Sequence, residues 1–284
     1  MLKHLHPNPT PPERLVILGA SGFVGKSVAT MAAQEKINTL LLSSRDVDLT
    51  AAKAVDQLVD LLAPQDSMIF CAAIDKGSSS GSEIFMQNIA MAQHIAAALQ
   101  RTPVKYLIYI SSDSVYGFET SLISEKNPPC PAPLYGAMHR AREMILAMET
   151  NVPLAVLRLT GIYGAGDMHN AYGPNRFWHE AKEHGKITLF GEGEEMRDHL
   201  YIEDAARLIL QTAQLGSTGL LNLATGRSLS FRHVAEMVAA QTGAVIQTAP
   251  RRQPITHRHF DITARLMAFP SFQPKMLEDA LADF

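Results

Sequence analysis

Residues 19–25 have the sequence Gly-Ala-Ser-Gly-Phe-Val-Gly and directly follow an apolar run at residues 15–18. A buried strand that ends in such a turn and continues as a helix points backbone N–H groups and the positive end of the helix dipole at one place. Gly19 permits the tight turn, Gly22 lets a phosphate approach the backbone, and Gly25 lets the helix pack closely on the strand. The segment therefore predicts a dinucleotide-binding turn; a glycine turn with a purely structural role is the alternative.

The composition excludes several other classes of protein. With 284 residues, the chain suits one large α/β domain or a large domain with a small appendage. Its net charge of −3 provides no basic surface for a nucleic acid, and no apolar run approaches the roughly 18 residues of a membrane span. Its two cysteines, Cys71 and Cys130, form neither a disulfide framework nor a zinc-ligand pattern. We therefore predict a cytoplasmic protein without a metal, a nucleic-acid partner or a membrane partner.

Short apolar runs alternate with helical patterns through the first half of the chain. Continuous apolar strands between helices indicate a parallel sheet covered on both faces, so the fold class is α/β with a doubly wound sheet. Ligands bind beyond the carboxyl ends of such strands, where the glycine turn, the serine-rich loop at 77–82, Ser111, Ser112 and Thr160 should converge. The predicted strands are 15–18, 39–42, 68–73, 104–110 and 154–157, and the predicted helices are 26–34, 51–63, 83–99 and 135–149.

The second half of the chain has a different pattern. After Gly164 the alternation loosens, and glycine, proline and asparagine become frequent. We predict a flexible tail at 1–13, a dinucleotide-binding domain at 14–164 and a smaller α/β lobe at 165–284 that binds the substrate. Part of this lobe could also return to the main sheet. Its predicted helices are 176–184, 203–214, 230–241 and 275–282.

Two segments carry side chains suited to catalysis. Residues 109–117 run from a predicted strand into a loop that contains Ser112, and Tyr135 opens a predicted helix. His139 follows Tyr135 by four residues and therefore lies on the same helical face. A phenol within hydrogen-bond reach of a substrate oxygen can neutralise the charge that hydride transfer leaves there.

Across nearly all of residues 14–284, the chain resembles the extended short-chain dehydrogenase/reductase family, specifically its nucleotide-sugar epimerases, dehydratases and reductases. The resemblance implies a Rossmann fold, a bound nicotinamide cofactor and a nucleotide-sugar substrate. Relatives often form a homodimer through the helices that correspond to 83–100 and 135–149, although packing against the sheet explains the apolar content of these helices equally well. The motifs that carry the resemblance are GASGFVG at 19–25, Ala72-Ala73, Asn88, SSDSVYG at 111–117, YGAMH at 135–139, LRLTGIYG at 157–164, RDHLYIED at 197–204 and NLATG at 222–226.

The resemblance implies a catalytic pair. Ser112 matches the Ser/Thr that hydrogen-bonds the reacting sugar oxygen, and Tyr135 matches the tyrosine that shuttles the proton while hydride moves to or from the nicotinamide. An unperturbed tyrosine has a pKa of about 10, which a nearby cation lowers. The family supplies that cation as a lysine four residues later, whereas this chain has His139. A histidine is mostly neutral near about pH 7, but it can hydrogen-bond a ribose hydroxyl.

This departure leaves two hypotheses open. The first is an NAD(P)-dependent epimerase or reductase in which Ser112, Tyr135 and His139 sustain catalysis on a nucleotide-activated sugar or a related small carbonyl compound. The second is a non-catalytic NAD(P)-binding protein that senses redox state or serves a partner. Ser112 and Tyr135 at the family spacing favour the first hypothesis, whereas His139 and Gly161 favour the second.

Further departures concern the substrate. Ser114 stands where the dehydratases carry a glutamate, next to an aspartate that Asp113 matches, so sugar dehydration is not expected. Gly161 replaces an asparagine that contacts the substrate in many relatives, so sugar recognition should differ. Arg197 matches the arginine that grips the nucleotide-sugar diphosphate, a task for which a guanidinium fork is suited. Arg176 could add a phosphate contact, and with Asp113 and Arg197 it completes the predicted substrate-binding residues.

The predicted cofactor is NADP, with NAD as the alternative. Arg45, after the second predicted strand, can pair with a 2′-phosphate, although a solvated loop charge would look the same and the adjacent Asp46 would suit the ribose diol of NAD. The run from Arg45 to Leu49 is similar to that of the NADP-using reductases of the family, in which the later Asp-Leu, here Asp48 and Leu49, lies by the adenine. The other predicted cofactor contacts are Gly19, Ser21, Gly22, Phe23, Val24, Gly25, Ala72 and Asn88.

Overall fold

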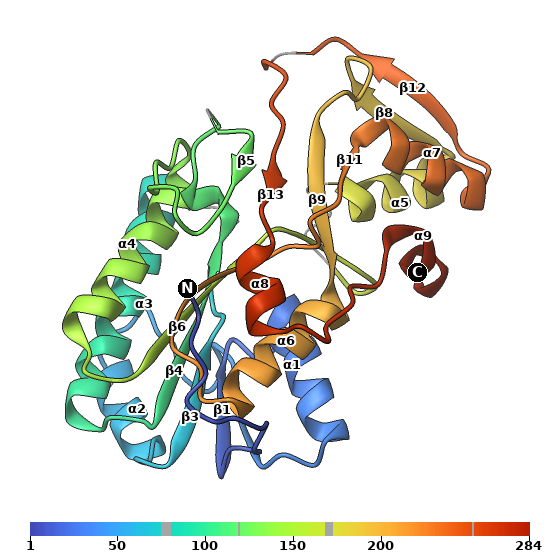
Figure 1. Ribbon diagram of the computed structural model, residues 1–284. Coiled ribbons are helices and arrows are strands. Elements are labelled where there is room, and N and C mark those ends of the chain that lie inside the picture. The colour runs from blue at the N-terminus through green and yellow to red at the C-terminus, as the bar shows by residue number, and fades with distance from the viewer. Residues whose placement is uncertain (75–80, 119, 168–172, 252) are drawn as a thin grey trace. The chain divides into compact units, whose positions relative to one another are not determined.

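The computed structural model describes residues 1–74, 81–118, 120–167, 173–251 and 253–284 (Figure 1). Most of the serine-rich loop predicted at 77–82, namely residues 77–80, lies outside the described residues. The chain forms two compact units. Unit 1 comprises Met1–Gly117, Glu125–Arg158 and Ala206–Leu221, and unit 2 comprises Phe118–Ser124, Leu159–Ala205 and Asn222–Phe284.

A six-stranded sheet forms the core of unit 1, in the order β10-β6-β4-β3-β1-β2. Strand β1 pairs in parallel with β2 on one side and β3 on the other, and β3 pairs in parallel with β4. The strands are mainly apolar and, apart from the edge strand β2, mostly buried, which confirms the predicted doubly wound α/β sheet. Their bounds are β1 Arg14–Leu18, β2 Thr39–Leu42, β3 Asp66–Phe70, β4 Tyr106–Ser112, β6 Leu154–Leu159 and β10 Gly219–Leu223.

Helices cover both faces of this sheet. Helices α2, α3 and α4 lie on one side, and α1 and α6 lie on the other (Figure 1). They agree with the predicted helices to within a few residues at each end, the usual uncertainty of helix boundaries. None of the helices that the structure describes is long and apolar enough to cross a membrane. Their bounds are α1 Phe23–Gln34, α2 Ala54–Leu61, α3 Gly81–Arg101, α4 Leu134–Glu149 and α6 Ile202–Gln214, with a short 3-10 helix, η1, at Asp113–Val115.

Unit 2 is built from small sheets and helices. Strand β9 lies between β7 and β11, β8 pairs in parallel with β12, and β5 pairs in parallel with β13. Helices α5 and α7 pack against each other and against β8. The bounds are β5 Leu122–Ile123, β7 Gly161–Tyr163, α5 Gly173–His184, β8 Lys186–Phe190, β9 Met196–Tyr201, β11 Ser228–Ser230, α7 Phe231–Thr242, β12 Val245–Ala249, β13 His259–Phe260, α8 Thr263–Ala268, α9 Leu277–Ala280 and the 3-10 helix η2 Leu281–Asp283.

The division of the chain is less simple than the predicted boundary near Gly164. Strand β10 returns to the six-stranded sheet, and residues 206–221 belong to unit 1. Conversely, residues 118–124 belong to unit 2, because β5 pairs with β13 near the end of the chain. The sequence pattern left open a return of the second half to the main sheet. It gave no sign that residues 118–124 join unit 2, because a two-residue strand is too short to show a hydrophobic period.

The N-terminal segment, predicted as a flexible tail at 1–13, makes a few specific contacts with the rest of unit 1 although its residues are exposed or half-buried. Lys3 forms an antiparallel bridge with Thr218, and the backbone N–H groups of Leu5 and His6 donate to the Leu215 carbonyl. The Tyr106 hydroxyl lies 3.1 Å from the His6 ring. The segment thus forms backbone hydrogen bonds with the residues that lead into β10. Its proline-rich sequence gave no sign of this pairing.

A buried ion pair joins α4 to the sheet. The Arg158 guanidinium on β6 donates to both carboxylate oxygens of Glu143 on α4, at 2.9 and 2.7 Å. Ser111 on β4 donates to the same carboxylate at 2.6 Å, and Arg158 donates to the Tyr116 hydroxyl at 2.7 Å. Both charged side chains are at most 4% exposed. One carboxylate therefore fixes α4 against β4 and β6 at once.

Replacing Arg158 with methionine should cost about 3–5 kcal/mol of unfolding free energy, because the buried Glu143 carboxylate would lose its two-point partner and keep only Arg140, 3.2 Å away, as a cation. Urea denaturation followed by circular dichroism measures this loss. The double variant Glu143→Met/Arg158→Met should recover much of it.

The matched control is Arg101→Met, which removes an exposed ion pair with Asp56 and should cost less than about 1 kcal/mol. An Arg158→Met variant as stable as this control would contradict the role assigned to the buried pair.

Candidate functional site

The glycine turn between β1 and α1 is a backbone cradle with no room for a side chain at Gly19 or Gly25. Gly19 has a φ of +92°, and a Cβ atom there would lie 2.7 Å from Ala72 Cα. A Cβ at Gly25 would lie 2.2 Å from the Gly19 carbonyl oxygen, whereas one at Gly22 would meet that oxygen at 3.4 Å. The first turn of α1 contains no acidic residue, and its N-cap residue, Gly22, has no side chain with which to cap it. Within the described residues, the N–H groups and the dipole of this helix end are therefore suited to an anion.

The residues of this turn differ in exposure. Ser21 and Gly22 are exposed, Phe23 and Val24 are half-buried, and Gly25 is buried under the turn. The exposed part of the turn is thus the part that a phosphate would approach, and the buried part sets the helix against the strand.

A cavity of about 250 Å³ lies next to the turn. It opens at the carboxyl ends of β1, β2 and β3, where the strand order reverses. Four predicted cofactor contacts line it, but Arg45 does not. An apolar lining with hydroxyl and carboxylate groups suits a flat heterocycle such as adenine. The lining residues are Leu18, Gly19, Leu42, Ser43, Ser44, Val47, Asp48, Leu49, Thr50, Ala72, Ile74 and Met91.

The loop after β2 uses its carboxylates locally. Asp46 accepts hydrogen bonds from the backbone N–H and hydroxyl of Ser43, at 2.8 and 2.7 Å, and these bonds lower its pKa. Asp48 accepts from the N–H and hydroxyl of Thr50, with the same effect on its pKa. Arg45 is exposed. Asp46 is therefore bound within its own turn, as turn aspartates often are.

Asn88, which is predicted to hydrogen-bond the cofactor, also uses its side-chain amide in bonds within the protein. It is fully buried on α3, and its side-chain oxygen accepts from the Ile74 N–H at 3.1 Å. Its amide nitrogen donates to the carbonyls of Ile74 and Ile84 at 2.7 and 2.9 Å. Asn88 thus shapes the loop after β3, which lines the cavity, and reaches a ligand only through that loop.

Ser112 ends β4 and caps η1. Its hydroxyl oxygen accepts from the Ser114 N–H at 3.1 Å and from the Ser114 hydroxyl at 2.9 Å. A serine hydroxyl has one proton to donate, and neither of these bonds uses it. Ser112 is half-buried, its hydroxyl proton is not used by these two bonds, and the half-buried Asp113 follows it in η1.

Helix α4 starts directly against η1. A Cβ atom at Gly136 would lie 2.0 Å from the Ser114 carbonyl oxygen, so no other residue fits there without a shift. This close approach places Tyr135, at the start of α4, beside the loop that Ser112 caps. The Tyr135 side chain is 43% exposed, and its phenol is accessible to a ligand.

His139 is buried beneath Tyr135. The two ring centres are 4.6 Å apart in an edge-to-face arrangement, and His139 is 3% exposed. Its Nδ1 lies 2.7 Å from the Tyr109 hydroxyl. Burial, with a smaller contribution from Arg142, lowers the pKa of His139 to about 3. His139 is therefore neutral and cannot supply the positive charge that the resemblance led us to seek at this position.

Arg142 is a site residue that the sequence analysis missed. It is fully buried, and its guanidinium carbon lies 4.1 Å from the centre of the Phe70 ring and 5.4 Å from that of Tyr109. It donates to the Ala72 carbonyl at 2.8 Å. A signal was present, because Arg142 follows Tyr135 by seven residues, which is two helical turns and the same face.

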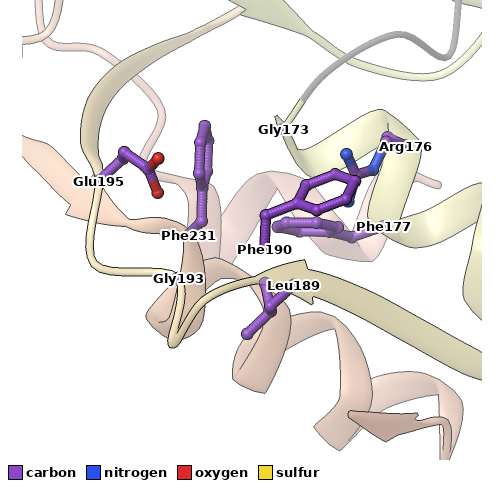
Figure 2. A pocket seen from close by; sticks show the side chains of 8 residues that line it. All are labelled: Gly173, Arg176, Phe177, Leu189, Phe190, Gly193, Glu195 and Phe231. Carbon is purple, nitrogen blue, oxygen red and sulfur yellow. The ribbon is translucent and has the colours of Figure 1, made fainter. Parts of the chain in front are cut away.

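Unit 2 contains a small aromatic pocket of about 70 Å³. Figure 2 shows the rings of Phe177 and Phe190 beside Arg176, with Phe231 and Glu195 facing them across the pocket. The sequence analysis named Arg176 but none of these rings. Arg176 donates to the Thr188 carbonyl at 2.5 Å and pairs with Glu180.

Arg197 does not line this pocket. Its guanidinium donates to the carbonyls of Met196 and Thr256, at 2.8 and 2.6 Å, and to the Thr256 hydroxyl at 2.8 Å. To grip a phosphate as predicted, Arg197 would have to exchange these bonds. Within the part of the chain that the structure describes, no group of three histidine, cysteine, aspartate or glutamate side chains could hold a metal ion.

Known proteins are similar to this chain in sequence and in fold. The model of the NAD dependent epimerase/dehydratase family matches residues 15–224. An uncharacterized UDP-glucose epimerase, YtcB, of Bacillus subtilis is 26% identical over 72% of this chain and 66% of its own length. The dTDP-4-dehydrorhamnose reductase of Mycobacterium tuberculosis is 27% identical over 87% of this chain and 81% of its own length. A GDP-L-fucose synthetase of Naegleria fowleri bound to NADP superposes with a TM-score of 0.87, at 20% identity, covering 99% of this chain and 95% of that one.

The glycine cradle can be tested apart from folding. A Gly22→Ala variant should fold normally, because the new Cβ makes only ordinary contact, but it should bind NADPH at least about tenfold more weakly, since the methyl group stands where the phosphate approaches. Fluorescence titration with NADPH measures the affinity, and thermal unfolding measures the stability.

Two variants serve as controls. Gly25→Ala should be destabilised by the contact at 2.2 Å, and Gly81→Ala, whose new Cβ would have no neighbour closer than 3.6 Å, should keep wild-type affinity and stability. Wild-type NADPH affinity in Gly22→Ala would show that the turn is structural only.

Proposed function

We propose that this chain, a member of the NAD dependent epimerase/dehydratase family, is an NADP(H)-dependent oxidoreductase or epimerase of a nucleotide-activated sugar or a related small carbonyl compound. The observation that carries the proposal is the close approach of α4 to η1 at Gly136, which sets the accessible Tyr135 phenol beside the loop capped by Ser112. A hydroxyl donor and a phenol at the carboxyl edge of a parallel sheet are suited to proton transfer at a carbonyl or alcohol oxygen.

Different residues of unit 1 have different roles in this reaction. A bound nicotinamide cofactor would supply the hydride. Ser112 donates its unused proton to the reacting oxygen and so orients it, and Tyr135 gives or takes the proton that accompanies hydride transfer. The cradle at Gly19–Gly25 and the neighbouring cavity would hold the diphosphate and the adenine.

NADP is the cofactor that the loop after β2 favours. The Asp46 carboxylate is already bound to Ser43, which leaves the exposed Arg45 as the charged group of this loop suited to a 2′-phosphate. The similar structure of the GDP-L-fucose synthetase was determined with NADP.

We assign nucleotide recognition to unit 2. The aromatic pocket of Phe177, Phe190 and Phe231 suits a flat base, which stacks on such rings. Arg176 and Arg197 supply guanidinium groups for the diphosphate, and Asp113 of unit 1 is a candidate partner for a sugar hydroxyl. The YtcB and dTDP-4-dehydrorhamnose reductase names both refer to nucleotide sugars, which supports this substrate class.

A homodimer through α3 and α4 is also part of the proposal. Met86 on α3 and Met144 and Met148 on α4 are 62%, 45% and 79% exposed, and apolar side chains of this kind suit an interface.

A Tyr135→Phe variant should keep its fold and its NADPH affinity but lose hydride transfer, because the phenylalanine has no proton to exchange. The measurement is a panel of sugar nucleotides assayed by the absorbance of the reduced nicotinamide. Tyr106→Phe, which removes a hydroxyl bound to His6 away from the site, is the matched control and should turn over normally. Unchanged turnover in Tyr135→Phe would remove Tyr135 from the mechanism, and tight NADPH binding without turnover on any substrate would favour a non-catalytic binding protein.

The cofactor preference has its own test. Wild-type protein should bind NADPH at least about tenfold more tightly than NADH, and Arg45→Met should abolish most of this difference by removing the partner of the 2′-phosphate. The exposed cation Lys53 gives a control, since Lys53→Met should leave the ratio unchanged. An NADH affinity tenfold above that for NADPH would reverse the assignment.

A further inference from the structure

The face of α4 that carries Tyr135 has no lysine at position 139 but has a buried arginine one turn later. His139 is neutral at this position, and Arg142 is fully buried. Among the residues that the structure describes, Arg142 has no carboxylate partner. Its guanidinium donates to the Ala72 carbonyl and to the Asn88 side-chain oxygen, and it lies over the Phe70 ring. Burial lowers the pKa of Arg142, yet an arginine keeps its proton inside proteins.

A buried cation without a counterion favours an anion nearby, because the anion restores part of the solvation that the cation has lost. Arg142 shares the helical face of Tyr135 and lies 5.4 Å from the ring centre of Tyr109, which is bound to His139 beneath Tyr135. The phenols of Tyr109 and Tyr135 and the thiol of Cys71 are within electrostatic reach of its charge. Burial raises the pKa of the Tyr109 phenol, and it raises that of Cys71 to about 12. Tyr135 is the exposed phenol of the set and is therefore the one that can give up its proton.

The hydrogen bond between Tyr109 and His139 sets the tautomer of the histidine. The Tyr109 hydroxyl is fully buried, and its neighbour Arg142 has only donors to offer. The hydroxyl proton therefore goes to His139 Nδ1, the acceptor 2.7 Å away. A neutral imidazole that accepts at Nδ1 carries its proton on Nε2. Nε2 is buried and has no hydrogen-bond partner within the described residues, in a ring that packs edge-to-face with Tyr135, so its N–H is not used by another acceptor there.

We propose that Arg142 and His139 divide the work of the family's lysine: Arg142 supplies the fixed positive charge that stabilises the Tyr135 phenolate, and His139 supplies the N–H donor. This inference rests on the proposed function of Tyr135 and concerns how that residue is tuned. When Tyr135 gives its proton to a substrate oxygen, it becomes the phenolate that Arg142 stabilises; when the reaction runs the other way, the phenolate takes the proton back. Arg142 and His139 are thus positioning residues that act through Tyr135.

The surroundings of Tyr135 make its own titration observable. His139 is in direct contact with Tyr135, and the ionisable and charged groups around Tyr109 and Arg142 on the same side of α4 include Glu143 on α4 and Cys71 after β3. His139 is neutral above about pH 4, Glu143 is paired with Arg158, and burial keeps Tyr109 and Cys71 protonated. Within this cluster, Tyr135 is therefore the group that should change charge between about pH 6 and 11.

The test is a pH titration of protein labelled with carbon-13 at tyrosine Cζ, followed by NMR, with the Tyr135 signal assigned by its loss in Tyr135→Phe. The protein is free of cofactor and substrate. Arg142→Met should raise the titration midpoint of Tyr135 by about one pH unit, because it removes the cation. Arg142→Lys should stay near the wild type, because it keeps the charge. His139→Lys/Arg142→Met, which restores a cation at the family's position, should bring the midpoint back.

An Arg142→Met midpoint equal to that of the wild type would overturn the proposal. If circular dichroism shows that Arg142→Met does not fold, His139→Lys/Arg142→Met decides, because it keeps one cation on this face of the helix. A Tyr135 titration midpoint near that of the wild type would then support the proposal, and a midpoint about one pH unit higher would overturn it. The titration is independent of turnover. Failure of the proposed function would instead appear as absent NADPH binding or absent activity, with the Tyr135 titration still sensitive to Arg142.

Discussion

The buried ion pair between Glu143 and Arg158 is the constraint on which the site depends. It joins α4 to β6, and through Ser111 the same carboxylate binds β4, the strand that ends at Ser112. A buried pair of this kind contributes little net stability compared with apolar packing, but it tolerates only one register of helix on sheet, because either charge alone would be costly. The geometry that brings Tyr135 beside the Ser112 loop follows from that register.

Much of unit 1 could be predicted from local pattern. The glycine turn, the parallel strands and the helices leave a periodic or compositional trace in the sequence, and the structure has them where they were expected. Features set by long-range pairing left no such trace. The N-terminal segment meets Thr218, and β5 meets β13, through contacts between residues more than a hundred positions apart. Whether a polar side chain such as Asn88 or Asp46 already makes its hydrogen bonds within the protein also depends on neighbours that the sequence does not reveal.

The lysine that the family motif leads one to expect is an instructive case. A motif comparison registers its absence at His139 and suggests a loss of function. The structure offers a different physical account, because a positive charge acts over distance in a desolvated interior and need not occupy one position. Arg142 lies on the same helical face, buried with aromatic rings around it. The chemistry needs a positive electrostatic potential at the Tyr135 phenol and a hydrogen-bond donor beside it. Arg142 and His139 together can provide both, as the single lysine does in the family motif.

The proposed oxidoreductase or epimerase activity requires a dinucleotide to lie on the turn at Gly19–Gly25 with its nicotinamide next to Tyr135. A crystal structure of the protein grown with excess NADP⁺ tests this most directly. The account predicts the diphosphate on the amides of the turn, the adenine in the cavity lined by Ser43 and Met91, and the nicotinamide ring beside the Tyr135 hydroxyl. Crystals with an empty turn, or with the ring directed away from that hydroxyl, would contradict it.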